Sequence, residues 1–150
     1  MDFAQAACTE CPGMSYLLSS EPIPDTTSPF GPGQGAEVRF LGVVRGVEAD
    51  RDILGIDYSA YLPMAERMLG ELIVQGQKEF GSHEVFLQHR LGFVAAAEPS
   101  ILIWVRSKHS AEAFDFCRWY LKEIKTRVPI WKKPVFSAAL ERADIDGQAG

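Results

Sequence analysis

The stretch at residues 125–134 reads KTRVPIWKKP and follows a segment with helical periodicity. Pro129 disfavours helical backbone angles at Val128, so the sequence predicts that this helix ends near Arg127. The chain then leaves the helix through a stiff, partly apolar turn. Residues 134–140, PVFSAAL, are expected to form a final short strand or edge segment. The sequence therefore predicts a helix, a proline turn and a short strand in this order, and the other elements are assigned relative to them.

The helix before this turn has apolar residues at spacings of three and four, which is typical of an amphipathic helix. They are Ala113, Phe114, Cys117, Tyr120, Leu121 and Ile124. Ser107 or Ser110 can cap its N-terminus, and Glu112 is favourably placed in its first turn. An earlier helix is expected from Pro63 to about Gly81. Its apolar stripe consists of Ala65, Met68, Leu69, Leu72 and Ile73.

Four strands are expected around these helices because their residues alternate or form short apolar runs. They are residues 36–46, 53–61, 84–92 and 100–107. The complete order is β-β-α-β-β-α-β. Paired strands separated by single helices favour an α+β layer fold over a doubly wound parallel sheet.

The composition of the 150 residues is that of one soluble globular domain, with 47% hydrophobic and 23% charged residues. No apolar run approaches the roughly 20 residues that span a bilayer. Residues 1–34 are rich in Pro, Gly, Ser and Thr, and we expect an N-terminal extension with one short strand near MSYLL. Residues 35–150 are expected to form the domain. Residues 1–14 hold no Lys or Arg, which argues against a secretory signal and favours a cytoplasmic protein.

Cys8 and Cys11 form a C-x-x-C pair, which is compatible with half a zinc site or a redox pair. No second such pair or paired histidines follow at ligand spacing, so a loose N-terminal segment is the favoured interpretation. Cys117 fits a small core residue. We expect no metal and no cofactor.

Charge is unevenly distributed along the chain, whose formal net charge is −5. Residues 106–133 hold eight Lys or Arg residues and only three Asp or Glu residues. This imbalance favours an anionic ligand for that region over general nucleic-acid binding.

Each candidate cation also has an ordinary structural interpretation. Lys125 complements the dipole of a helix C-terminus, and Lys132 and Lys133 fit a solvated surface pair. A rigid turn with apolar walls instead favours a partly desolvated lysine that serves as a base, nucleophile or phosphate ligand. Arg45 ends a strand, where either a surface role or a ligand contact is possible. His89 sits on a strand, and for it a structural role is favoured.

Five motifs occur together in an order that resembles the large, catalytic subunit of molybdopterin synthase. They are FLGVVRG, YSAYLPMAE, HRLG, SKHSAEAF and LKEIKTRVPIWKK. The resemblance covers about residues 36–133. It implies an α/β hammerhead fold with an additional antiparallel subdomain.

The resemblance also implies an enzyme of molybdenum-cofactor biosynthesis. The family converts cyclic pyranopterin monophosphate to molybdopterin with sulfur from the thiocarboxylated C-terminal Gly-Gly tail of a small ubiquitin-like subunit. Its large subunits form a homodimer with a small subunit at each end, a heterotetramer. Neither a nucleic-acid nor a membrane partner is expected.

Site residues follow from the same resemblance, position by position. Lys125 and Lys132 correspond to the catalytic lysines, and their individual roles could be exchanged. Substrate-binding roles are implied for Arg45, His109, Phe40 and Lys133.

Two positions depart from the family pattern. Ser110 stands where the family usually has an arginine, and Ala97 stands where it commonly has a glycine. The first departure keeps an alternative open, namely a degenerate family member that binds an anion or a ubiquitin-like partner without catalysis.

Overall fold

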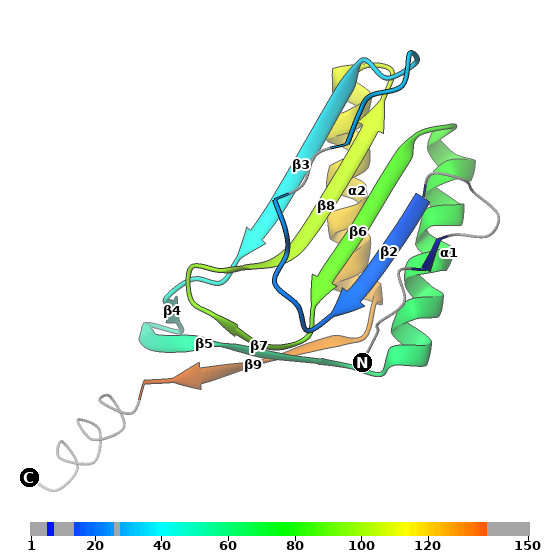
Figure 1. The fold of residues 1–150 in the computed structure, drawn as a ribbon. Coiled ribbons are helices and arrows are strands. Elements are labelled where there is room, and N and C mark those ends of the chain that lie inside the picture. Colours follow the sequence, from blue (N-terminus) through cyan, green and yellow to red (C-terminus); the bar gives the residue numbers. More distant parts are fainter. Residues whose placement is uncertain (1–5, 8–13, 26–27, 138–150) are drawn as a thin grey trace, which may run out of the picture.

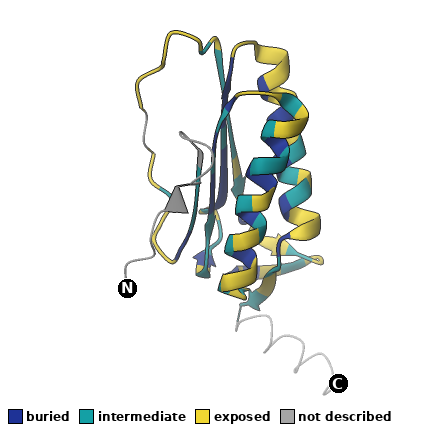
Figure 2. Cartoon of the chain, turned by 90° about the vertical axis from the view of Figure 1, so that its right-hand side faces the viewer, coloured by how far each residue is buried: buried dark blue, intermediate teal, exposed yellow. Residues whose placement is uncertain are grey.

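The computed structural model describes residues 6–7, 14–25 and 28–137. Two helices, α1 (Leu62–Phe80) and α2 (Ser110–Arg127), cover one face of a five-stranded sheet (Figures 1 and 2). The strand order is β1-β2-β6-β8-β3, and only the β2–β6 pair is parallel. The strands are β1 (Ala6–Ala7), β2 (Met14–Ser19), β6 (Glu84–Arg90), β8 (Pro99–Ser107) and β3 (Ala36–Val43).

A second, smaller sheet lies across one end of the first (Figure 1). Its central strand β5 (Arg51–Ala60) pairs antiparallel with β4 (Val47–Glu48), β7 (Gly92–Ala95) and β9 (Ile130–Phe136). The seven expected elements are β3-β5-α1-β6-β8-α2-β9, in the expected order. The α+β fold with an added antiparallel sheet is therefore confirmed.

The main core lies between the large sheet and the two helices. Fully buried side chains include Leu72, Ile73, Val85, Ile103 and Tyr120. A separate small cluster packs under the small sheet and consists of Val44, Ile53, Ile56 and Val94. The molecule thus has two separate apolar clusters, one associated with each sheet.

The C-terminus of α2 follows the sequence prediction. The helix ends at Arg127, and Val128 is extended with ψ 127° before Pro129. Its N-terminus differs, because His109 is the N-cap and makes no side-chain capping bond, while Ser110 is the first helical residue. The hydroxyl of Ser107 donates to the His109 carbonyl instead, at 2.8 Å.

The expected apolar stripe of α2 was wrong at one position. Phe114 is 62% exposed, and Phe116 is buried. Phe116 also follows Ala113 at a helical spacing, and its ring stacks on Phe80 with centroids 4.7 Å apart. The spacing alone therefore allowed two phenylalanines, and the packing partner on α1 selects between them.

Strand ends shift by a few residues because pairing decides them. β9 begins at Ile130 rather than at residue 134, since it pairs with β5 from the Ala60–Ile130 position onward. Residues 138–140 of the expected strand lie outside the described residues. β4 and β7 were not anticipated, because such short strands carry no periodic signal.

Residues 14–19 of the expected N-terminal extension form β2, and Leu18 of this strand belongs to the main core. The boundary at residue 34 stays a prediction. Cys8 and Cys11 lie outside the described residues. Neither α1 nor α2, the helices within the described ranges, has the length and apolarity needed to cross a membrane.

Candidate functional site

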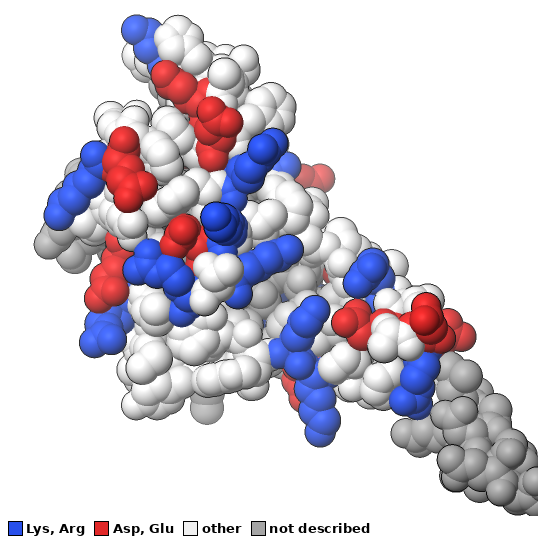
Figure 3. All heavy atoms as spheres, turned by 180° about the vertical axis from the view of Figure 1, so that it is seen from behind, with Lys and Arg blue, Asp and Glu red and all other residues white. Residues whose placement is uncertain are grey.

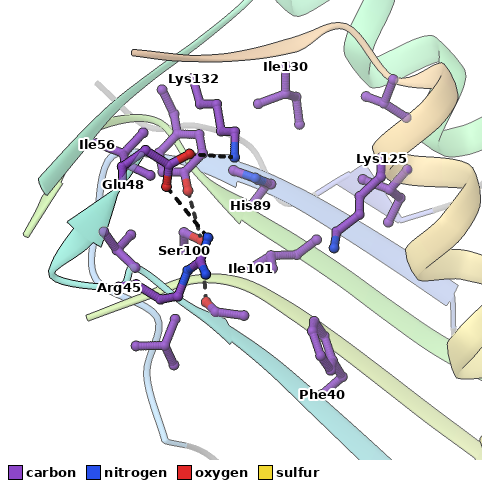
Figure 4. Close-up of a pocket in the computed structure, with 16 residues that line it drawn as sticks. Phe40, Arg45, Glu48, Ile56, His89, Ser100, Ile101, Lys125, Ile130 and Lys132 are labelled. Carbon is purple, nitrogen blue, oxygen red and sulfur yellow. Dashed lines mark hydrogen bonds and ion pairs between the residues drawn. The ribbon is translucent and has the colours of Figure 1, made fainter. Parts of the chain in front are cut away.

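A pocket of about 600 Å³ lies at the junction of the two sheets and the C-terminal end of α2 (Figure 4). Its lining comes from β3, β4 and the link between them, from β5, β6 and β8, and from α2 and β9. The polar and charged lining residues are Arg45, Glu48, Tyr58, His89, Ser100, Lys125 and Lys132. Segments distant in sequence thus meet at one cavity.

The floor of the pocket continues the core-facing row of the large sheet. Gly42, Ile101 and His89 occupy paired positions on β3, β8 and β6. A Cβ at position 42 would lie 2.5 Å from a methyl carbon of Ile101, so the close approach requires glycine. Phe40 precedes this row and forms an apolar wall.

Lys125 and Lys132 both line the pocket, although they belong to different elements. Lys125 lies in the last turn of α2, and Lys132 is the third residue of β9. The short turn after Arg127 brings the two elements together. Because side chains alternate along a strand, Ile130 and Lys132 face the pocket while Trp131, 59% exposed, does not.

The carboxylate of Glu48 lies between two cations of the pocket (Figure 4). One of its oxygens is 3.7 Å from Arg45 Nη2, and the other is 3.9 Å from Lys132 Nζ. Both cations are well exposed, so each pair contributes little to folding stability. Their effect is local, because the carboxylate fills part of the space that an anionic ligand would take.

One wall is fixed by a short chain of hydrogen bonds. The Tyr58 hydroxyl donates to Ser100 Oγ at 3.3 Å, and Ser100 Oγ donates to the Gly42 carbonyl at 3.3 Å. The Tyr58 ring meets the His89 ring edge-on, with centroids 4.9 Å apart. The bonds join β5 of the small sheet to β8 and β3 of the large one.

His89 faces the pocket from β6, with its Nδ1 2.8 Å from the Arg90 carbonyl oxygen. Desolvation by burial lowers the pKa of this imidazole, and the bond to the Arg90 carbonyl opposes the shift. Sequence reasoning gave His89 a structural role and did not identify Glu48 or Tyr58. The sequence does contain a pattern that points to His89. It follows Val85 and Leu87 at every second position of β6, which places its side chain on the core-facing side of the sheet.

The structure brings together four of the six residues that the sequence singled out. Lys125, Lys132, Arg45 and Phe40 line the same pocket. Lys133 does not line it, because it follows Lys132 on β9 and points to the other face. His109 caps the opposite end of α2 from Lys125, sixteen residues or about 24 Å along the helix.

Comparisons with known proteins match most of the chain. A family model described as MoaE protein matches residues 18–127. A molybdopterin synthase catalytic subunit from Arabidopsis thaliana is 38% identical over 106 residues, 71% of this chain and 54% of that protein. One from Thermoplasma volcanium is 38% identical over 104 residues, 69% of this chain and 76% of that protein. The chain therefore spans little more than half of the plant relative.

Solved structures share the fold. A molybdopterin synthase from Staphylococcus aureus superposes with a TM-score of 0.74 at 29% identity. The superposition covers 81% of this chain and 90% of the Staphylococcus aureus chain. A chain from a complex of subunits 1 and 2 of molybdopterin-converting factor from Helicobacter pylori has a TM-score of 0.58 at 21% identity. This superposition covers 71% of this chain and 73% of the Helicobacter pylori chain. With a family model that matches residues 18–127 and a fold shared with these proteins, the chain belongs to the MoaE protein family.

Proposed function

We propose that this protein is the catalytic subunit of a molybdopterin synthase. It transfers sulfur from the thiocarboxylated Gly-Gly tail of a small ubiquitin-like subunit to cyclic pyranopterin monophosphate. The observation that carries the proposal is the convergence of Arg45, Lys125 and Lys132 on one pocket. The names of the relatives from Arabidopsis thaliana and Thermoplasma volcanium support the same activity.

The charge of the pocket suits both reactants of this reaction. The substrate carries a phosphate and the sulfur donor is an anionic thiocarboxylate, so two negative groups must approach each other. Cationic side chains offset their repulsion and hold them by charge-assisted hydrogen bonds. Lys125 and Lys132 reach the pocket from different elements, α2 and β9, which fits one lysine for each reactant; either assignment is compatible with the geometry.

The dimensions of the pocket suit a chain terminus as the sulfur donor. A volume of about 600 Å³ accommodates a pterin together with the end of an extended tail. The relatives are named as catalytic subunits, which supports a separate subunit as the donor.

A homodimer is part of the proposal because His109 cannot reach the pocket of its own chain. The helix α2 separates it from Lys125 by about 24 Å. His109 therefore contributes to substrate binding only if a second copy places its own α2 N-terminus over this pocket. Ser110, in place of the family arginine, would lie beside it.

Reconstitution tests the proposal directly. The purified protein, given a thiocarboxylated small subunit and cyclic pyranopterin monophosphate, should form molybdopterin. Lys125→Ala and Lys132→Ala should each lower the rate by about 100-fold or more, since each removes charge stabilisation at the reacting groups. Lys122→Ala, an exposed lysine one turn earlier on α2, is the matched control and should retain the wild-type rate.

Two results would contradict the assignment. Near-normal turnover by both alanine variants would remove the two lysines from catalysis. Capture of the small subunit without any turnover by the wild-type protein would favour the non-catalytic alternative.

A further inference from the structure

We propose that His89 is a further catalytic residue, which accepts the proton of the water molecule that releases the sulfur-donor tail. The inference rests on the proposed function and assigns a residue to its hydrolytic step. It starts from the position of His89 at the floor of the pocket (Figure 4).

The hydrogen bond of His89 defines which ring nitrogen is available. Nδ1 lies 2.8 Å from the carbonyl oxygen of Arg90, which can only accept, so Nδ1 carries the hydrogen. The lone pair of the neutral ring is then on Nε2. This atom has no hydrogen-bond partner among the described residues and is not one of their buried unpaired atoms, so the pocket leaves it accessible.

The ring is also held in one orientation. The Arg90 carbonyl fixes one edge, and the edge-on contact with Tyr58 fixes the plane. Tyr58 is itself bonded to Ser100. A proton acceptor that is positioned in this way needs no rearrangement when the reaction occurs.

The surroundings favour the neutral imidazole, which is the form that accepts a proton. Burial lowers the pKa of His89 from its ordinary value of 6.5. The titratable groups that face the pocket around it are Arg45, Glu48, Tyr58, Lys125 and Lys132. Three of them are cations that oppose a further positive charge, while Glu48 is already engaged by two of these cations.

The proposed reaction needs such an acceptor once for every sulfur transferred. When the thiocarboxylate sulfur has formed its bond to the substrate carbon and an oxygen substituent has left that carbon, the tail is attached as a thioester. The oxygen of a water molecule then bonds to the acyl carbon, and its proton passes to His89 Nε2. The carbon–sulfur bond breaks, the electron pair goes to sulfur, and His89 returns the proton to it. The tail leaves as a carboxylic acid, which ionises, and no redox partner takes part.

The other lining residues suit this task less well. The three cations serve to bind the anionic reactants, and Glu48 is paired with Arg45 and Lys132. The Tyr58 hydroxyl is engaged as a donor to Ser100. Among the lining residues of the described pocket, His89 is the one imidazole.

Two substitutions separate catalysis from structure. His89→Asn keeps an N–H group near Nδ1 that can bond the Arg90 carbonyl, but removes Nε2. His89→Gln keeps a polar group near Nε2 that cannot take up a proton. If His89 had only a structural role, one of the two variants should replace it better than the other. If His89 accepts a proton, both variants should lose that function.

The measurement is a single turnover of the complete complex, with thiocarboxylated small subunit and pterin substrate, followed by mass spectrometry of the intact small subunit. In both variants the thioester adduct should accumulate, and its hydrolysis should slow by about 100-fold, as expected for loss of a general base. The wild-type hydrolysis rate should fall at acidic pH as His89 is protonated, and neither variant should show that decline. Circular dichroism and thermal unfolding verify that the variants fold.

The possible failures are distinguishable. If the wild type forms product and a folded variant hydrolyses the adduct at the wild-type rate, the role of His89 is overturned while the proposed function stands. If the folded wild type forms neither adduct nor product, the proposed function fails, and this inference fails with it.

Discussion

Glu48 is the single acidic residue among those that line the described pocket, and it contacts two of the three cations there. An internal carboxylate of this kind has two opposite effects. It draws the exposed Arg45 and Lys132 side chains toward itself, and it competes with any anionic ligand for them. Binding of an anion therefore requires exchange of one negative group for another.

Glu48→Gln should raise the affinity for inorganic phosphate by about two- to fivefold, because weak ion pairs of this type are worth about 0.5–1 kcal/mol. Phosphate titration monitored by NMR of the protein measures the affinity. Glu98→Gln is the matched control, since Glu98 pairs with Arg90 at 2.7 Å and does not line the pocket. An equal gain in both variants would mean that net charge alone is responsible.

Single residues were predictable from the sequence where a short motif fixes their geometry. Lys125 and Lys132 flank one turn, so their proximity follows from local rules. Glu48 and His89 come from separate strands, and their place in the same pocket as these lysines depends on how the two sheets meet. No local pattern contains that information, although the alternation along β6 did indicate which way His89 points.

Among the elements, the turn between β7 and β8 departs from local preference at one residue. Ala97 has a φ of 71°, a left-handed conformation that glycine adopts more easily. Four backbone hydrogen bonds hold the turn: the amides of Ala96, Ala97 and Glu98 donate to the carbonyls of Leu54, Val44 and Ala95, and the Val44 amide donates to the Glu98 carbonyl. The surrounding structure thus imposes the conformation on an alanine, at the position where the resembling family commonly has glycine.

Ala97→Gly should stabilise the protein by about 0.5–1 kcal/mol, because it relieves the strained backbone. Denaturation by urea measures the change in free energy of unfolding. Ala96→Gly, in the same turn but without positive φ, should instead destabilise it, since glycine only adds freedom to the unfolded chain. Destabilisation by both substitutions would contradict the role of the turn.

The element boundaries that the sequence predicted well carry chemical markers. Pro129 ends α2 through its effect on Val128, and Gly81 ends α1 with a φ of 80°. The small strands β4 and β7 are too short to show a periodic pattern and depend on pairing with β5. They were therefore visible only in the folded chain.

At the scale of the whole molecule, two sheets with separate apolar clusters meet at the pocket. The face opposite to that of Figure 1 shows Lys and Arg interspersed with Asp and Glu rather than a continuous basic surface (Figure 3). The pocket, by contrast, gathers Arg45, Lys125 and Lys132 around one carboxylate, which suits a small anion or a chain terminus better than a nucleic acid. The proposed dimer adds the His109 end of α2 to that cavity.

Complementation tests the dimer. His109→Ala and Lys125→Ala should each be nearly inactive alone, but co-expression should restore about one quarter of wild-type activity. Half of the randomly formed dimers are mixed, and each mixed dimer has one pocket with both residues intact. Differently tagged chains allow the mixed species to be purified. If mixed dimers form but remain inactive, His109 does not serve the neighbouring pocket.

The length of the linker between α2 and β9 also determines which of two adjacent lysines faces the site. Side chains point to opposite faces at successive positions of a strand. If one residue were inserted after Val128 and the same backbone positions of β9 still paired with β5, every side chain of β9 would move to the opposite face. The inserted chain would then present an indole where an ammonium group now stands. Odd and even insertions should consequently differ far more in activity than in the stability of the protein.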